Sequence, residues 1–204
     1  MVKIYGVFLL KQNSPSSKPL LLSSYYDSGS WYSFFYTDQL SELTIFLAKL
    51  LAEKTTPGFR QQVEKDELTG YVQKTRDGLS CVVVTDQDYP FRVAFDLVRH
   101  TLRDFQDWLL QSSFTTFSKD NECSAFNTTL KDVMTKFQDP TQADKAMKLK
   151  KDLEETKEIL HQTMEKLLDR GTQIDKLIEQ ADGLSEGAKD FYRKTRKSKC
   201  CIIL

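Results

Sequence analysis

Two of the four cysteines, Cys200 and Cys201, lie in the last five residues, where their neighbours indicate covalent modification. Cys201 is followed by Ile202, Ile203 and Leu204, which is the C-a-a-X pattern that prenyltransferases recognise when they alkylate a cysteine sulfur. A leucine in the last position favours a geranylgeranyl group, although a farnesyl group remains open. The adjacent Cys200 can take a second lipid, either a palmitoyl or a second prenyl group. The sequence therefore predicts covalent lipids as the chain's only non-protein groups.

A run of positive charge precedes these two cysteines. The segment from 193 to 199 holds five basic residues, whereas the remaining residues hold 24 basic against 29 acidic ones and the whole chain has a formal net charge of zero. Each basic residue near an anionic leaflet contributes roughly 1 kcal/mol, and one lipid chain alone gives only reversible attachment. The run predicts anchoring at a membrane surface rather than binding of nucleic acid. The basic residues are Arg193, Lys194, Arg196, Lys197 and Lys199.

Other residues that could do chemistry lack the partners that catalysis or metal binding requires. The four cysteines include no CxxC pair, and the only histidines, His100 and His161, have no paired nucleophile. Asp86 and Asp88 flank a turn, where carboxylates are common. None of the eight glycines is followed by lysine, which excludes the phosphate-binding loop of a prenylated GTPase. We expect no catalytic site, no metal site and no small-molecule substrate.

The longest patterned stretch runs from 142 to 198 and contains no proline. Apolar residues recur in steps of three and four, which keeps one stripe facing a partner helix and predicts a coiled coil. Met164 and Ile178 lie beside this stripe, as does Ile159, and the wider face favours a bundle of several helices. We call the following fourteen positions, eleven of them apolar, the inward stripe: Ala146, Leu149, Leu153, Thr156, Leu160, Thr163, Leu167, Arg170, Ile174, Leu177, Ala181, Leu184, Ala188 and Phe191.

Arg170 is the charged residue in this stripe. Seven stripe positions precede it, and eight follow if the pattern continues through Thr195 and Ser198. A guanidinium has five donors that all need acceptors once water is excluded. One interpretation is that a lone polar residue merely fixes the register or reaches solvent. The other is that partner helices supply acceptors at the same level, so that this layer locks one alignment.

A helix of about sixteen layers with a central arginine resembles the arginine-bearing class of SNARE proteins, which drive membrane fusion. The resemblance implies a parallel four-helix bundle with three partner helices, each offering a glutamine opposite Arg170. A glutamine carbonyl accepts hydrogen bonds from guanidinium without adding a second buried charge. The bundle-facing residues that the resemblance implies are Leu149, Leu153, Leu160, Leu167, Ile174, Leu177, Leu184 and Phe191.

The part of the chain before this stretch predicts an α+β domain. The patterns give the order β-β-α-β-β-β-α-α, with Thr37 or Asp38 as the cap of the first helix and Asp139-Pro140 as the break after the last. A five-stranded antiparallel sheet flanked by helices accounts for this order. The predicted strands span 2–10, 18–26, 60–65, 69–75 and 79–85. The first predicted helix carries apolar residues from Leu40 to Leu51 and is closed by Pro57-Gly58, and the other two span 91–110 and 126–137.

This domain resembles the profilin-like longin domain found at the N-terminus of some SNARE proteins. The resemblance rests on Lys3-Ile4-Tyr5-Gly6-Val7-Phe8 and on the stretch from Val84 to Phe95, which reads VTDQDYPFRVAF. It implies a closed form in which the longin domain holds the SNARE helix and shelters the lipid, with a groove near Phe46. The alternative for Phe46 is plain core packing.

The sequence thus predicts a longin domain at 1–137, a SNARE coiled-coil motif at 138–198 and a lipidated tail at 199–204. The chain contains no window of eighteen apolar residues, the length needed to span a membrane. We therefore expect the protein in the cytoplasm and on the cytoplasmic face of endomembranes such as Golgi, endosomal or vacuolar vesicles. Taken together, these features resemble a lipid-anchored SNARE of the longin family. The alternative is a prenylated scaffold whose long helix forms a homodimeric coiled coil.

Overall fold

A computed structural model describes residues 3–26, 31–112, 116–141, 143, 159–168 and 172–197. The elements of the first 137 residues are β1 (Ile4–Lys11), β2 (Leu20–Tyr26), α1 (Trp31–Lys54), β3 (Arg60–Lys65), β4 (Leu68–Lys74), β5 (Leu79–Asp86), α2 (Phe91–Gln111), the 3-10 turn η1 (Ser124–Phe126) and α3 (Asn127–Phe137). The described elements nearer the C-terminus are β6 (Ile159–Thr163), α5 (Met164–Leu167), α6 (Ile174–Glu179) and α7 (Glu186–Lys197).

The strands form one sheet in the order β2-β1-β5-β4-β3-β6. Neighbouring strands from β1 to β5 are antiparallel, and β6 is added parallel to β3 at one edge. The central strand β5 is almost entirely buried because helices cover both of its faces, which explains its continuous apolar run Cys81-Val82-Val83-Val84. The sheet therefore provides two separate apolar surfaces.

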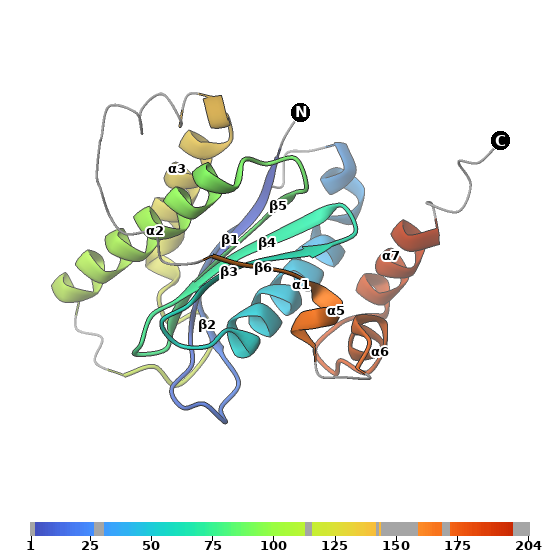
Figure 1. Cartoon of the computed structure of the whole chain (residues 1–204), viewed down its shortest axis with the longest axis horizontal. Helices are drawn as coiled ribbons and strands as arrows, with labels where there is room; N and C mark the ends of the chain where they lie inside the picture. Colours follow the sequence, from blue (N-terminus) through green and yellow to red (C-terminus); the bar gives the residue numbers. More distant parts are fainter. Residues whose placement is uncertain are drawn as a thin grey trace.

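Alternating side chains divide the core into two clusters on opposite faces of the sheet. Cys81 and Val83 of β5 point toward α2 and α3, whereas Val82 and Val84 point toward α1. Figure 1 shows α2 and α3 on one side of the sheet, with α1 and the C-terminal elements α5, α6 and α7 on the other. The second face is thus shared by the N-terminal domain and the C-terminal segment.

The two edges of the sheet are closed in different ways. At β2, the loop after α2 supplies the partners: the amides of Asn121 and Cys123 donate to the carbonyls of Leu21 and Leu22, at 2.6 and 3.0 Å. The edge at β3 is closed by β6, which is distant in sequence. An unpaired edge offers a row of backbone donors and acceptors to any extended chain, so β3 is where a strand from elsewhere can be added.

Hydrogen bonds fix the point at which the chain leaves α3. The Tyr89 hydroxyl donates to the Phe137 carbonyl at 2.7 Å, and the Tyr71 hydroxyl donates to the Tyr89 carbonyl at 3.1 Å. The Gln138 side chain then pairs with both backbone groups of Ile4, at 2.8 and 3.2 Å. Tyr89 belongs to one of the two longin-like motifs, which gives that motif a structural role in anchoring the end of the domain.

Burial accounts for the two described cysteines. Cys81 and Cys123 are both fully buried, and the free thiol of Cys81 lies inside β5. Burial raises the pKa of the Cys81 thiol far above its usual value and raises that of Cys123 to about 11. Both thiols are therefore protonated and unreactive at neutral pH, which the polar sequence around Cys123 did not indicate.

The predicted five-stranded antiparallel sheet flanked by helices is confirmed, and β6 is a sixth strand that the sequence did not predict. The predicted cap at Thr37 or Asp38 is wrong, because α1 begins at Trp31. The expectation of one continuous helix is also wrong for this conformation. Residues 159–163 form a strand, and the described residues after them form three shorter helices that follow the surface of the domain.

Gly78 provides a test of the turn between β4 and β5. Its φ is +84°, and a Cβ there would overlap the Gln12 carbonyl oxygen, whereas Gly58 has a similar φ of +88° with its nearest neighbour, Arg76 Cγ, 3.7 Å away. We expect Gly58→Ala to cost about 1 kcal/mol of unfolding free energy and Gly78→Ala at least about 2 kcal/mol, measured by urea denaturation. Equal losses would show that backbone conformation alone matters at both sites.

Candidate functional site

The described parts of the C-terminal segment return to the domain along the face that α1 covers. Met164, Leu168, Ile174 and Ile178 are buried in the same cluster as the α1 residues, and Leu184 and Ala188 extend that contact to α7. The α1 residues of the cluster are Leu43, Leu47, Ala48, Leu50, Leu51 and Ala52. We call this α1 surface, together with Val63 of β3 and Val84 of β5, the docking groove.

The docked segment fills the groove closely. The space left between Met164, Leu47, Leu51 and the sheet has a volume of about 20 Å³, which is room for about one water molecule. On α7, small residues permit close approach, since Ala188 is fully buried and a Cβ on Gly187 would lie 3.4 Å from Gln39 Cγ of α1. Close packing of this kind is typical of a protein core and indicates a specific contact.

A chain of side-chain hydrogen bonds connects β6 to the end of α1. Gln162 Nε2 donates to Gln61 Oε1 at 2.6 Å, and Gln61 Nε2 donates to Thr55 Oγ1 at 2.5 Å. Thr55 Oγ1 in turn donates to the Leu51 carbonyl at 2.5 Å, with Thr55 and Gln61 both buried. A slip of β6 by one residue would move Gln162 to the other face of the sheet, so this chain of hydrogen bonds specifies the register.

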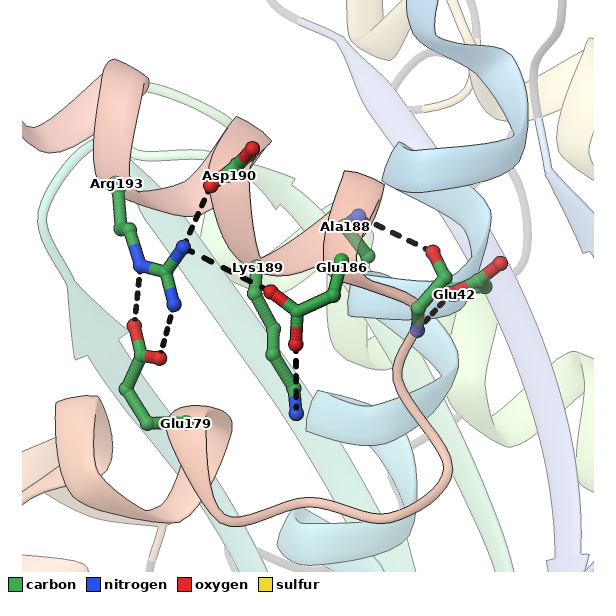
Figure 2. Close-up of polar contacts among 8 residues, drawn as sticks. Glu42, Glu179, Glu186, Ala188, Lys189, Asp190 and Arg193 are labelled. Carbon is green, nitrogen blue, oxygen red and sulfur yellow. Dashed lines mark hydrogen bonds and ion pairs between the residues drawn. The ribbon is translucent and has the colours of Figure 1, made fainter.

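The start of α7 is capped partly by the N-terminal domain (Figure 2). The Ser185 side chain accepts a hydrogen bond from the Ala188 amide at 3.2 Å, which is the role of an N-cap residue. The Ser185 amide donates to Glu42 Oε2 of α1 at 2.8 Å. In a capping box that second contact comes from a residue of the same helix. Here α1 provides it, so the first turn of α7 is stabilised by docking.

Two ion pairs, one between α6 and α7 and one between β3 and α5, add to the docked arrangement. Arg193 binds both oxygens of Glu179 and also contacts Asp190, as Figure 2 shows. Lys65 of β3 donates to Glu165 of α5 at 2.8 Å. The hydrogen bond from Lys65 lowers the pKa of Glu165, and that from Arg193 lowers the pKa of Glu179. Three of these side chains are well exposed and Lys65 is half-buried, so each pair contributes little alone.

The comparisons with known proteins cover the whole chain. Residues 30–130 match the longin model, described as a regulated-SNARE-like domain, and residues 145–203 match the synaptobrevin model. Proteins named Synaptobrevin homolog YKT6 are 34% identical over 205 residues in Debaryomyces hansenii and 36% identical over 203 residues in Schizosaccharomyces pombe. The VAMP-like protein YKT61 of Arabidopsis thaliana is 33% identical over 204 residues. Each match spans 99–100% of this chain and 100% of the relative.

The chain belongs to the longin-domain SNARE family. This confirms the family that the stripe, the central arginine and the domain order resemble. Longin SNAREs are non-enzymatic trafficking proteins that act in vesicle transport. Within the described residues, no group of three or more His, Cys, Asp or Glu side chains could hold a metal ion. The helices of that same part of the chain are all too short or too polar to cross a bilayer.

The structure brings several predicted bundle-facing residues of this longin SNARE onto the docking groove. Ile174 and Leu184 are buried there, and Leu167, Leu177 and Phe191 pack against it half-buried. Leu160 does not join them, because 53% of its surface is exposed on β6. Phe46 is also half-buried and packs against this cluster. It therefore lies beside the docking groove and also belongs to the core, so both interpretations of this residue describe its position.

Other predicted residues lie at the margin of the description or beyond it. Arg193 is engaged in the ion pairs above and Lys194 is exposed, while Arg196 and Lys197 fall in the last turn of α7. The remaining predictions lie outside the described residues: the central-layer Arg170, the bundle-facing Leu149 and Leu153, the basic Lys199 and the lipidation candidates Cys200 and Cys201.

Sequence reasoning missed several residues that hold the segment in place. Met164 and Ile178 were noticed only as apolar residues beside the stripe, and Leu168, the second of two adjacent leucines, was not singled out. The available signal was that the segment has more apolar residues than a single a/d stripe can bury. Gln162, Gln61 and Glu42 carry no pattern at all, because their contacts join positions 101 and 143 residues apart.

The lowered pKa of Glu165 predicts how docking responds to acid. A carboxyl whose pKa is depressed on docking contributes stability above its usual pKa of 4.5, and this contribution is lost as the pH falls through the depressed value. We expect Glu165→Gln to speed hydrogen exchange of the β6 amides at pH 7. The gap from the wild type should close only once the pH has fallen below the depressed pKa of Glu165, where both side chains are neutral. A gap that persists in acid would assign the effect to packing of the glutamine.

Proposed function

We propose that this protein is an arginine-bearing SNARE that contributes residues 138–198 to a parallel four-helix bundle with three glutamine-bearing helices. Bundle formation drives fusion of intracellular vesicles, and the conformation described above is the closed, autoinhibited state. The match to synaptobrevin over 145–203 and the similarity to relatives along the full chain support the proposal. The observation that carries it is the docking of the inward stripe on the longin domain.

The closed state and the bundle compete for the same side chains. Ile174, Leu184 and Ala188 of the inward stripe are buried in the docking groove, and a four-helix bundle would bury the same positions against partner helices. A side chain cannot occupy both cores at once. The longin domain therefore acts as a substitute partner, and assembly requires the segment to leave the groove first.

Several closed-state contacts cannot exist in a continuous helix. Arg193 and Glu179 are 14 residues apart in sequence, and Tyr192 and Asp175 are 17 apart, yet each pair is hydrogen bonded. An α-helix rises 1.5 Å per residue, which would separate these pairs by about 21 and 26 Å. Residues 159–163 likewise have to leave the β-ladder to become helical. Conversion to the bundle must break these contacts.

The tail supplies the membrane attachment in this proposal. A prenyltransferase modifies Cys201, a second lipid is added to Cys200, and the basic run contacts anionic headgroups on the cytoplasmic face of endomembranes such as Golgi, endosomal or vacuolar vesicles. Arg193, a member of that run, is paired with Glu179 in the closed state. Opening breaks this pair and leaves Arg193 with its contact to Asp190 on the same helix.

The homodimeric scaffold considered from the sequence has less support. That alternative needs the inward stripe to lack an intramolecular partner, so that a second copy covers it. In the described residues, the stripe from Ile174 to Ala188 is instead covered within one chain. The resemblance of the whole chain to longin SNAREs also favours assembly with other SNARE helices.

The central-layer assignment is tested by replacing Arg170. We expect Arg170→Ala to lower the stability of the four-helix complex by about 1–3 kcal/mol, because the facing glutamine side chains lose their donor. Thermal melting, followed by circular dichroism with purified glutamine-bearing SNARE helices taken in sets of three, measures the loss. Arg103→Ala, which removes an exposed arginine on α2, is the control. Unchanged melting of the Arg170→Ala complex would refute the assignment.

The lipid anchor is tested by replacing the two terminal cysteines separately. We expect Cys201→Ser to move the protein from the membrane pellet to the supernatant, because prenylation is lost and the second lipid depends on membrane contact. Cys200→Ser should leave a weaker attachment that salt disrupts, since one lipid and the basic run remain. Cell fractionation at two salt concentrations checks both variants. Membrane attachment of the Cys201→Ser protein would mean that the anchor lies elsewhere.

A further inference from the structure

The docked segment uses more than its inward stripe to bind the longin domain. Leu160, a stripe residue, is 53% exposed, whereas three apolar residues outside the stripe are among the most buried of the segment. Met164 is 3% exposed, Leu168 is 5% exposed and Ile178 is fully buried. All three pack in the cluster that contains Leu43, Leu47 and Leu51 of α1. The longin domain thus contacts residues of the segment that lie outside the fourteen positions of the inward stripe.

Helical geometry shows where these residues would lie in a bundle. If the stripe occupies the a and d positions of a heptad, with Leu160 at a, then Gln162 falls at c, Met164 and Ile178 at e, and Leu168 at b. Position b lies about 130° from the middle of the a/d stripe, so the side chain of residue 168 would point to solvent. A leucine there gains nothing from the bundle, but in the closed state it is buried.

The polar contacts of the closed state follow the same rule. Gln162, which continues the hydrogen bonds from Gln61, is at c, and Glu165, which accepts from Lys65, is at f. Asp175, which accepts from the Tyr192 hydroxyl at 2.6 Å, is at b, and Glu179, the partner of Arg193, is at f. None of these positions belongs to the inward stripe. The apolar contact of Leu168 and these polar contacts therefore both lie on the outward face, and Met164 and Ile178 at e connect that face to the stripe.

We propose that Leu168, supported by Gln162 and by the flanking Met164 and Ile178, determines closure, and that Leu168 and Gln162 are not required for the bundle. The inference rests on the proposed function and extends it: one segment carries two recognition faces, the inward stripe for partner helices and an outward set for the longin domain. Ile174, Leu184 and Ala188 serve both, whereas Leu160 serves the bundle and Leu168 serves closure. Closure can then be changed by substitution without altering the surface on which fusion depends.

The test compares one substitution at two leucines that lie eight residues apart. Leu168→Ser and Leu160→Ser are made in the full chain, and hydrogen exchange of the β6 and α7 amides is followed by mass spectrometry. We expect exchange at least tenfold faster in Leu168→Ser and within threefold of the wild type in Leu160→Ser. Amides of β1 and β5 report whether the longin domain itself stays folded. Gln162→Ala, which removes the hydrogen bond to Gln61 at an outward position, is a second closure variant, for use if Leu168→Ser lowers protection in those strands.

Assembly provides the opposite readout with the same two variants. With purified glutamine-bearing SNARE helices taken in sets of three, Leu168→Ser should assemble at least as fast as the wild type. Leu160→Ser should form a complex that melts at lower temperature. Equal effects of the two variants on exchange, or slower assembly of Leu168→Ser, would overturn the division into two faces. Absence of β6 protection in the wild-type protein would contradict the closed state itself, and the assignment of closing residues with it.

Discussion

Burial of the C-terminal segment in the docking groove is the contact on which the rest of the structure depends. Without it, α1 would expose Leu43, Leu47 and their neighbours, and the segment would expose a long apolar stripe. Contiguous apolar patches of that kind bind partners or aggregate. Each surface covers the other, and both faces of the sheet are thereby packed by residues of this one chain.

Docking is also why the segment loses its regular form. A coiled-coil stripe stays straight over many turns, but the path from the β3 edge to α7 requires the chain to change direction. The segment meets this requirement with a strand and with helices as short as α5, Met164–Leu167, and α6, Ile174–Glu179. Isolated helices of that length are unstable in water. Tertiary contacts hold them, so their loss would free the segment to adopt another form.

The docked arrangement and the proposed bundle would differ in which polar groups are paired as well as in packing. The Glu42 contact to Ser185 and the Arg193 pair with Glu179 form only when the chain turns back on α1. These contacts are exposed and weak alone, as the proposed opening of the closed state requires. The hydrogen bonds from Gln162 through Gln61 to Thr55 are more buried, and they fix a single register of β6 on β3, which the exposed pairs do not.

The order of strands and helices in the N-terminal domain follows from the sequence, because alternation in β5 and helical spacing in α2 are local patterns. The inward stripe, its central arginine and the terminal cysteines are local patterns as well, and by themselves they indicate the family. Only the tertiary structure decided that residues 159–163 pair with β3 and that Leu168 rather than Leu160 is buried. Those outcomes depend on contacts between residues about a hundred positions apart in the sequence. The C-terminal segment has two faces that could be buried, and its local pattern does not tell which of them fits the β3 edge and the docking groove.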